Sequence, residues 1–490
     1  MVVNDRPPLW VKTLIRPPLL PSDVYAIENG TVHTVAEDGT IEGGVVVIDG
    51  SEIGVVGNDA EIPAEATVID AAGKHVTPGL VDAHSHAGMA EWGEPEDADV
   101  NEGTDPVTPH VNAIDGFHPR DGELERAFQG GVTTVSARMG SGNVVGGVIC
   151  SMKTYGDLAD EMCIREDGMK AAMGENPKRY HGEQKDRQPS TRSGVAATLR
   201  QALMDAEDYA DRRARAEGED EPFDRDLGMA NLARVVEGEL PLRVHAHRAD
   251  DIATVFRIAE EFGISDLSIE HATEGHLIAE EFERRDVPAI VGPSISSASK
   301  YELRNITFET PGLLQEAGVR VAIQTDAPVL PQEHLDVCVG LAVREGLPES
   351  VALESVTRTP AEILGIDDRV GTLEAGTDAD VAVWDGPMFE LGSDAEEVFV
   401  DGEHAYSRDR DDVNPARSGP GRLLDTLEGL SCDRRFADIV PSERLVSVRS
   451  CEPSACRKSP SRTSKRSRIS WARTRSGGRS PVRSRGWTLR

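Results

Sequence analysis

The sequence predicts an α/β protein: a (β/α)8 barrel with a small β-sandwich built from both chain ends. Two observations carry this prediction. In the central part of the chain, short apolar runs alternate with helix-like segments of about 10–15 residues, a pattern typical of βαβ units and parallel sheets. In the flanking segments, short β-rich runs are separated by Asn-Gly and Asp-Gly pairs, which favour tight hairpins. The first pattern predicts the barrel, and the second predicts the sandwich.

Eight apolar runs are candidates for the barrel strands, beginning with the run that contains Leu80. The other seven, in chain order, are Val132–Ala137, Val148–Met152, Met169–Met173, Leu242–Ala246, Leu267–Glu270, Ala289–Gly292 and Val321–Thr325. Between the later runs, apolar residues recur at helical spacing in 250–262, and 275–285 is a second helix-like segment. Eight parallel units of this kind fit a (β/α)8 barrel, whose active site lies at the carboxyl ends of the strands.

The chain divides into five expected regions. They are an extension at 1–22, the first part of the sandwich at 23–77, the barrel at 78–368, the second part of the sandwich at 369–410 and a tail at 411–490. The tail carries 18 Lys and Arg but eight Asp and Glu, with no acid after Glu452. We expect the tail to be disordered or translated out of frame, rather than a basic segment that binds nucleic acid. The extension at 1–22 is equally foreign to the fold or disordered.

Several predicted strands end in histidine or aspartate. The first ends at His84-Ser-His86, and residues two apart on a strand point to the same face, so both imidazoles would project together. Paired imidazoles are suitable ligands for a divalent metal ion. The later strands end in further candidates: His245, His247, His271 and Asp326. Because the carboxyl ends of barrel strands meet at one face, these side chains indicate a metal centre there.

Five motifs add a family resemblance to this pattern. They are PGLVDAHSH at 78–86, GMKAAMGENPK at 168–178, VHAHRADDI at 244–252, IEHATEGH at 269–276 and TDAP at 325–328. With them the chain resembles the amidohydrolase superfamily of metal-dependent hydrolases, and more narrowly its imidazolonepropionase-like members, from about Tyr25 to Tyr406. The resemblance implies a TIM barrel beside a β-sandwich, with the closing motif GTDADVAVWD in a structural role. It also implies a set of metal ligands: His84, His86, His245, His271 and Asp326.

Two parts of the implied metal centre stay open. On the fifth strand His245 and His247 share a face, so either could be the ligand. The resemblance favours His245, which would leave His247 to contact substrate or to support a ligand. Binuclear members of the family also take a bridging ligand from the fourth strand. Lys170, as a carboxylated lysine, and Glu175, as a direct carboxylate, are the candidates, with Lys153 a weaker third; a mononuclear site would use none of them.

The resemblance implies hydrolysis of a carbon–nitrogen bond in a non-peptide amide or cyclic amide. One or two divalent ions, with zinc preferred and iron or manganese also suitable, would activate a water molecule. Asp326 would move the proton of that water to the leaving nitrogen, and His271 or His247 would hold the oxyanion. His110, in a long loop after the first strand, is a further candidate for substrate contact. The alternatives are a dipeptidase or prolidase-like peptidase, and a catalytically silent barrel that serves as a scaffold.

Composition indicates the salt conditions, the cellular compartment and the kinds of partner to expect for this chain. It has 86 acidic and 52 basic residues, a net charge of −34, which is typical of halophilic proteins kept soluble at high salt. This charge argues against binding of the folded core to nucleic acid or to an anionic membrane, and no run of 18 apolar residues predicts a membrane span. Without a signal-peptide pattern or paired spacing of Cys150, Cys163 and Cys338, we expect a cytoplasmic enzyme acting on a small-molecule substrate. Whether it forms a homo-oligomer is left open.

Overall fold

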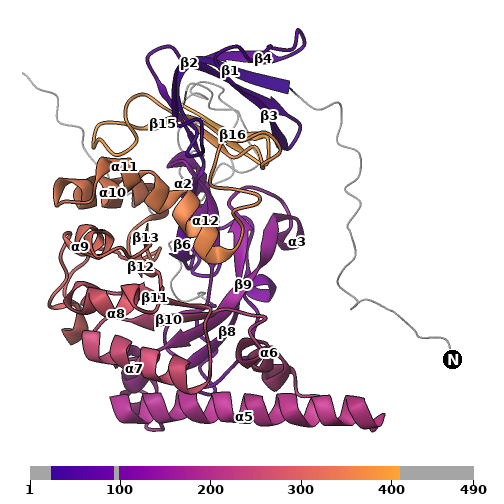
Figure 1. Ribbon diagram of the computed structural model, residues 1–490, viewed down its shortest axis with the longest axis vertical. Helices are drawn as coiled ribbons and strands as arrows, with labels where there is room; N and C mark the ends of the chain where they lie inside the picture. The colour runs from indigo at the N-terminus through magenta and orange to yellow at the C-terminus, as the bar shows by residue number, and fades with distance from the viewer. Residues whose placement is uncertain (1–23, 93–98, 409–490) are drawn as a thin grey trace, which may run out of the picture. The chain divides into compact units, whose positions relative to one another are not determined.

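The computed structural model describes residues 24–92 and 99–408, which form two sheets of eight strands each (Figure 1). The central sheet has a strand at each of the eight predicted places. Its strands are β6 (Leu80–Ser85), β7 (Val132–Ala137), β8 (Val145–Lys153), β9 (Cys163–Ala172), β10 (Leu242–Ala246), β11 (Leu267–His271), β12 (Ala289–Val291) and β13 (Val321–Ile323). They pair in chain order from β6 to β13. The Asp326 amide donates to His84 O (3.3 Å) and the His86 amide to Ala327 O (2.9 Å), so the sheet nearly closes into the predicted barrel.

One strand of the barrel runs against the prediction of eight parallel strands. β8 pairs antiparallel with both β7 and β9, whereas the other neighbouring pairs in this sheet are parallel. The cause is the short loop at 138–144 between β7 and β8, since a parallel return needs a crossover of roughly a dozen residues or more. The start of β8 therefore lies beside the carboxyl end of β9, with Val145 opposite Ala171.

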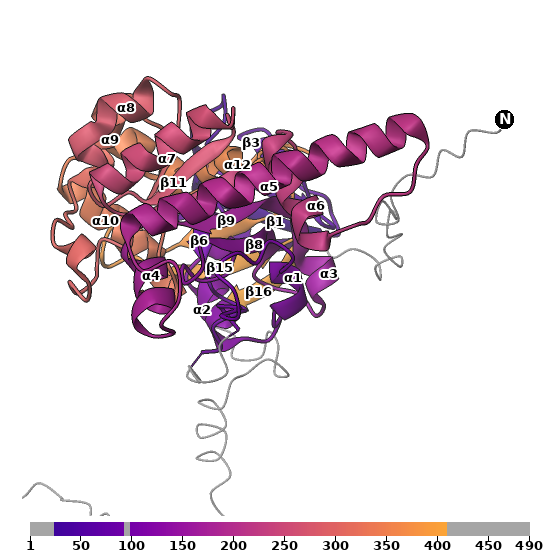
Figure 2. The ribbon, with the colours of Figure 1, turned by 90° about the horizontal axis from the view of Figure 1, so that it is seen from below.

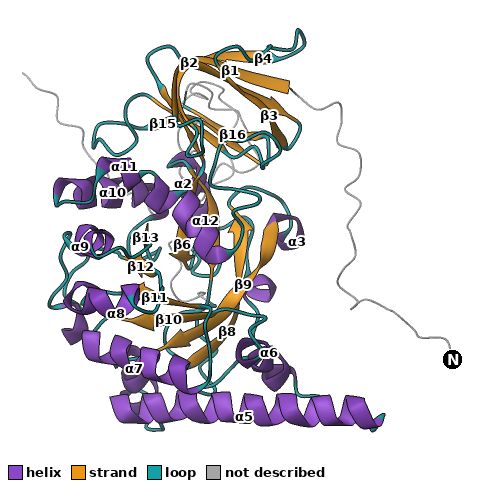
Figure 3. Ribbon diagram, viewed as in Figure 1, coloured by secondary structure: helices purple, strands orange, loops and turns teal. Residues whose placement is uncertain are grey.

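Helices cover the outside of the barrel sheet (Figure 3). They are α1 (Ala113–Gly116), α2 (Gly122–Gln129), α3 (Ala159–Met162), α4 (Glu175–Lys178), α5 (Arg192–Glu219), α6 (Leu227–Val236), α7 (Ala249–Glu261), α8 (Ala279–Glu283), α9 (Thr310–Glu316), α10 (Leu335–Arg344), α11 (Glu349–Ala352) and α12 (Arg358–Leu364). Single turns are η2 (Arg179–Glu183), η3 (Gly275–Ile278), η4 (Tyr301–Leu303), η5 (Gln332–His334) and η6 (Glu354–Val356). Both predicted helical segments are present, the first as α7 and the second as η3 followed by α8.

The helices pack on the barrel through apolar faces of helical period. In α7, Ile252, Val255, Phe256 and Ile258 are buried in one apolar cluster with residues of β10 and β11. The longest helix, α5, packs its first half into the same cluster, and Figure 2 shows its far end extending past α6. The core thus lies between the strands and this helical layer.

The second sheet is built from both chain ends, as predicted. Its strands are β1 (Val24–His33), β2 (Thr40–Asp49), β3 (Glu52–Gly57), β4 (Thr67–Asp70), β5 (His75–Pro78), β14 (Val381–Trp384), β15 (Ala395–Val400) and β16 (Glu403–Ser407). Their order is β16-β15-β14-β5-β1-β2-β3, with β4 paired to β1. The antiparallel pair of β14 with β5 joins the two ends of the chain.

A buried lysine connects this second sheet to the barrel. Lys153, at the end of β8, lies 2.9 Å from carboxylate oxygens of both Asp378 and Asp380 and 3.3 Å from Asp401 Oδ1. Burial alone would lower the pKa of Lys153, but the three carboxylates raise it above the ordinary value of lysine. The aspartates of the GTDADVAVWD motif, Asp378 and Asp380, therefore fix the end of β8 to the second sheet. Lys153 is fully engaged at this end of β8, and its suggested role as a bridging metal ligand is wrong.

The predicted extension at 1–22 and tail at 411–490 lie outside the described residues. Within the part of the chain that the structure describes, no helix combines the length and apolar character needed to cross a bilayer.

Candidate metal centre

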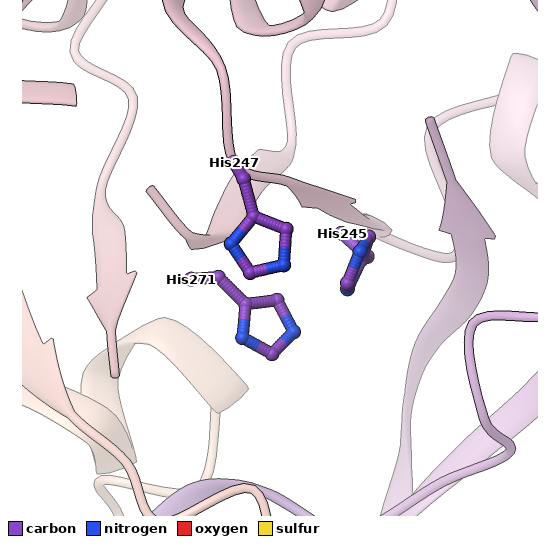
Figure 4. Close-up of side chains that lie close together, drawn as sticks. All are labelled: His245, His247 and His271. Carbon is purple, nitrogen blue, oxygen red and sulfur yellow. The ribbon is translucent and has the colours of Figure 1, made fainter. Parts of the chain in front are cut away.

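Two groups of side chains gather where the barrel strands end. The first contains His84 and His86, at the end of β6, together with Asp326, just beyond β13. The second contains His245, His247 and His271, from the ends of β10 and β11 (Figure 4). In each group the atoms that could bind a metal ion lie within 4.8 Å of one another. The structure thus brings together the strand-end residues that the sequence singled out.

The first group converges on one carboxylate oxygen. Asp326 Oδ1 lies 3.3 Å from His84 Nε2 and 3.2 Å from His86 Nε2. The two histidines reach the same oxygen because they are two residues apart at the strand end, and Asp326 is held there by its backbone bond to His84.

The second group is continuous with the first. The ring centroids of His245 and His247 lie 4.3 Å and 4.7 Å from that of His271, and the His84 ring centroid lies 4.7 Å from that of His271. Figure 4 shows the three rings of the second group facing a common space. Five imidazoles and one carboxylate therefore form a single cluster.

Three of these imidazoles are oriented by an oxygen behind them. His86 Nδ1 lies 2.7 Å from Arg138 O, His271 Nδ1 lies 2.8 Å from Gly292 O, and His247 Nδ1 lies 2.8 Å from Thr273 Oγ1. The Nε2 atoms of His247 and His271 are buried and lack a hydrogen-bond partner among the described residues. An imidazole anchored through one nitrogen with the other nitrogen free is the usual arrangement of a metal ligand.

The electrostatics of the cluster suit a divalent cation. Burial lowers the pKa of His84, His245 and His247 well below the ordinary value and that of His271 to about 3, so the rings are neutral donors. Burial opposes ionisation of Asp326, but His271 and the hydrogen bond from His86 outweigh it and lower its pKa. Neutral imidazoles with an ionised carboxylate are a donor set that zinc and similar ions prefer.

A buried charge network supports the cluster from below. Glu270, fully buried next to His271, lies 2.7 Å from Lys170 Nζ and 3.0 Å from His84 Nδ1, and it also accepts a hydrogen bond from Arg138. Lys170 is among the charges that lower the pKa of all four buried histidines. The structure thus places Lys170 close to the cluster, bound to a carboxylate.

The two remaining candidates from the sequence, Glu175 as a metal ligand and His110 as a substrate contact, have other surroundings than Lys170. Glu175, at the start of α4, faces Arg179 Nη1 at 3.4 Å, while its backbone amide donates to Glu302 (2.9 Å). His110 is exposed, on a loop that passes the start of α6 beside Gly228.

The sequence missed several residues that touch the cluster. Arg138 and Glu270 could have been found from the sequence. Arg138 directly follows β7, and Glu270 precedes His271 in the motif IEHATEGH. Lys300 and Glu302 could not have been found in this way, because the segment that follows β12 matches no sequence pattern. Glu302 is nevertheless buried, with Oε1 4.0 Å from His245 Nε2 and 3.9 Å from His247 Nε2.

Comparison with known proteins decides the family. The model of the amidohydrolase family matches residues 75–407, which span the barrel sheet and the C-terminal strands of the second sheet. This chain belongs to the amidohydrolase family. As an amidohydrolase it is an enzyme, a hydrolase acting on carbon–nitrogen bonds. The predicted resemblance is confirmed.

Individual relatives agree with this assignment. Amidohydrolase tasK of Hapsidospora irregularis is 31% identical over 368 residues, which cover 70% of this chain and 37% of that protein. Imidazolonepropionase of Rhizobium meliloti is 26% identical over 393 residues, covering 73% of this chain and 89% of the relative. The crystal structure of an amidohydrolase from Thermotoga maritima is 40% identical, with a TM-score of 0.75, and covers 78% of this chain and 100% of its own. The amidohydrolase described here thus shares the fold of a solved member.

Proposed function

We propose that this amidohydrolase uses one or two divalent metal ions to hydrolyse a non-peptide amide or cyclic amide of a small molecule. The observation that carries the proposal is the cluster of imidazoles around Asp326, of which His84, His245, His247 and His271 are buried and neutral and two leave Nε2 without a partner among the described residues. Relatives named amidohydrolase and imidazolonepropionase support the reaction class. Zinc is the proposed metal because imidazole dominates the donor set, and iron or manganese would also suit it.

From this cluster we propose roles for individual side chains. His84, His86 and Asp326 would hold an ion on one side, and His271 with a histidine of β10 on the other. Lys170 or Glu175 would be the additional ligand if two ions are bound. When bound, a divalent ion lowers the pKa of its water and polarises the scissile carbonyl.

The protein's own groups handle the proton and the developing charge. Asp326, ionised because its pKa is lowered, would take the proton of the attacking water and return it to the leaving nitrogen. A neutral imidazole of the second group would donate a hydrogen bond to the developing oxyanion. Glu270, which accepts a hydrogen bond from Arg138, would keep the His84 ring in place.

The cellular location, the salt conditions and the domain bounds of the enzyme are part of the proposal. We propose a cytoplasmic enzyme of a high-salt environment, with a catalytic barrel at 78–368 and a sandwich from 23–77 and 369–410. His110 stays a proposed substrate contact.

Metal analysis of the purified full chain tests the function. We expect bound divalent metal, loss of activity on chelation, and recovery when zinc, manganese or iron is returned. The substrate screen would use N-acyl amino acids, cyclic amides and dipeptides. Full activity in metal-free protein would contradict the proposal.

A further inference from the structure

A cavity of about 390 Å³ lies at the amino ends of the barrel strands, whereas the cluster of histidines lies at their carboxyl ends. Its lining includes the residue directly before each of four strands: Pro241 before β10, Asp266 before β11, Pro288 before β12 and Arg320 before β13. Residues at the end of α12 also line it. Small-molecule sites in proteins have volumes of about 300–1,000 Å³, so the cavity is large enough to be one.

Three arginines line this cavity, although the chain carries a net charge of −34: Arg165 of β9, Arg243 of β10 and Arg320. Arg243 is buried. Burial lowers its pKa, and the charges of Arg165 and Arg320 lower it further, against the opposite effect of Asp266 and Asp167. Arg165 and Arg320 therefore repel the Arg243 guanidinium, and an anion in the cavity would offset that repulsion.

The carboxylates in the lining compensate the arginines only in part. Asp266 Oδ1 lies 3.5 Å from Arg243 Nη1, and its side chain is 60% exposed. Asp286 Oδ1 lies 3.7 Å from Arg320 Nη2, and its side chain is 90% exposed. Both distances are long for a hydrogen bond, and such exposed pairs are weak. The third acid, Glu362, lies 3.6 Å from an arginine of α12 that is not part of the lining.

Arg165 forms no ion pair with another described residue. Its Nη1 donates to Gly365 O (2.6 Å) and its Nε to Glu166 O (3.3 Å), both of which are backbone oxygens. A guanidinium has five N–H donors in a planar fork, so Arg165 keeps further donors for a ligand. This fork matches the oxygens of a phosphate group, which is why arginine is common in phosphate sites.

The backbone around the cavity holds two of the arginines in place. Arg243 Nη2 donates to Ile363 O (2.6 Å), as Arg165 does to Gly365 O. Glycines give both side chains room: a Cβ at Gly168 would lie 2.6 Å from Arg243 Cγ, and a Cβ at Gly365 would lie 3.0 Å from Arg165 Nη1. Donors that are fixed before a ligand arrives lose little conformational entropy when it binds.

We propose that this cavity, called the arginine cavity below, binds a small molecule through a phosphate group held by Arg165, Arg243 and Arg320. A carboxylate has fewer oxygens and less charge, so it would engage fewer of the three guanidinium groups. The apolar part of the lining, which includes Pro241 and Leu267, would contact the rest of the molecule. The site is separate from the proposed metal centre and does not depend on the function proposed above.

Phosphate affinity of the full-length protein tests the inference. Isothermal titration with inorganic phosphate, at fixed pH and at an ionic strength set with KCl, would compare the wild type with Arg165→Gln, Arg320→Gln and the control Arg257→Gln. Arg257 of α7 is exposed, donates to Ala253 O (3.2 Å) and lies outside the arginine cavity. We expect each cavity variant to bind phosphate ~10-fold or more weakly, the scale of a lost charge-assisted hydrogen bond, and the control to match the wild type.

The variants also distinguish this site from the metal centre. Phosphate bound to a metal ion at the carboxyl ends of the strands would not be weakened by changes at their amino ends. Unchanged affinity in both cavity variants therefore overturns the inference, as does equal weakening in the control or a wild type that binds no phosphate. Arg320→Gln keeps the test decisive if circular dichroism shows that Arg165→Gln does not fold, because Arg165 also holds the backbone after α12.

A variant of opposite sign tests whether the arginines bind an anion or serve only the backbone after α12. Asp266→Asn removes the carboxylate next to Arg243 and should tighten phosphate binding by ~3-fold or more. Asp250→Asn, whose pair with Arg248 (2.8 Å) lies outside the arginine cavity, is the control and should change nothing. Absence of any gain in Asp266→Asn overturns the inference. Acetate should bind the wild type more weakly than phosphate, and equal affinity overturns the assignment of a phosphate group.

Discussion

Asp326 is the only carboxylate in the first group of the cluster, with Oδ1 within 3.3 Å of His84 Nε2 and 3.2 Å of His86 Nε2. The proposed chemistry requires it both to bind metal and to move a proton. Asp326→Asn keeps an oxygen ligand but cannot take a proton. We expect it to fold and keep part of its metal, while kcat falls by ~10²-fold or more.

The control for this prediction is His84→Ala, which should lose metal as well as activity because an imidazole ligand is removed. Metal content and steady-state rates of both variants, with the substrate found in the screen, separate the two effects. Near-normal turnover of Asp326→Asn would show that another group carries the proton.

Glu270 contacts two buried basic groups beneath the cluster: the Arg138 guanidinium, and Lys170, whose pKa is lowered well below its ordinary value by burial and by Arg138. Glu270→Gln removes the carboxylate that both groups contact, which leaves the buried Arg138 guanidinium without its ion pair. We expect a loss of about 3 kcal/mol in the free energy of unfolding, measured with urea. Glu260→Gln is the control: its ion pair with Arg285 (2.8 Å) is half exposed and should be worth about 1 kcal/mol or less. Equal effects would mean that the buried network contributes no more than a surface pair.

Sequence predicts the residues of the candidate site that lie at strand ends. His84 and His86 follow from the two-residue period of a strand, and Asp326 from an apolar run that ends in an acid. Lys300 and Glu302 could not be found in this way, because they lie in and beside the short turn η4 and contact residues far away in the chain, such as Asn176 and Arg192. Which nitrogen each histidine presents also depends on such partners, which the sequence does not show.

At the scale of elements, the sequence locates strands better than it orients them. An apolar run has the same composition in either direction, so β8 was found but its antiparallel course was not. The short loop at 138–144 was the available signal, because no helix fits between β7 and β8. The consequence is functional: the antiparallel course takes Lys153, at the end of β8, to the second sheet, while Lys170 stays near the cluster.

The contact of Lys153 with the second sheet gives a pH-dependent prediction. Lys153→Met leaves Asp378, Asp380 and Asp401 close together without this cation, and we expect a loss of about 3 kcal/mol at pH 8. Burial already raises the pKa of Asp380, and removing Lys153 raises it further. Between the unfolded and folded pKa values the folded state binds more protons, so stability falls as pH rises. The loss should therefore be smaller at pH 5 than at pH 8.

Urea unfolding at both pH values measures the difference. Lys74→Met, which removes a partly exposed pair with Glu396 (2.6 Å), is the control and should change stability by about 1 kcal/mol or less. A loss from Lys153→Met that does not vary with pH would mean that Asp380 is not the group that takes up the proton.

At the scale of the whole molecule, the pattern of the chain predicted the fold class. Both ends show the hairpin-rich β pattern and the centre shows alternating runs, which matches two sheets with β5 and β14 paired across the chain. The helical period of the apolar residues also predicted that the helices pack on the barrel. The net charge of −34 over the whole sequence did not contribute to predicting the fold.

The acidic excess predicts that stability depends on salt. The tail at 411–490 is basic, so the rest of the chain is more acidic than the net charge of −34 indicates. Repulsion between carboxylates is unscreened at low ionic strength, so we expect Tm to rise by several degrees from low to multimolar KCl. Replacing the exposed acids of α5 in the variant Glu207→Gln/Asp208→Asn should reduce that rise, because repulsion on one face is then weaker. Equal melting points in low and high KCl would contradict the halophilic interpretation, whatever the variant does.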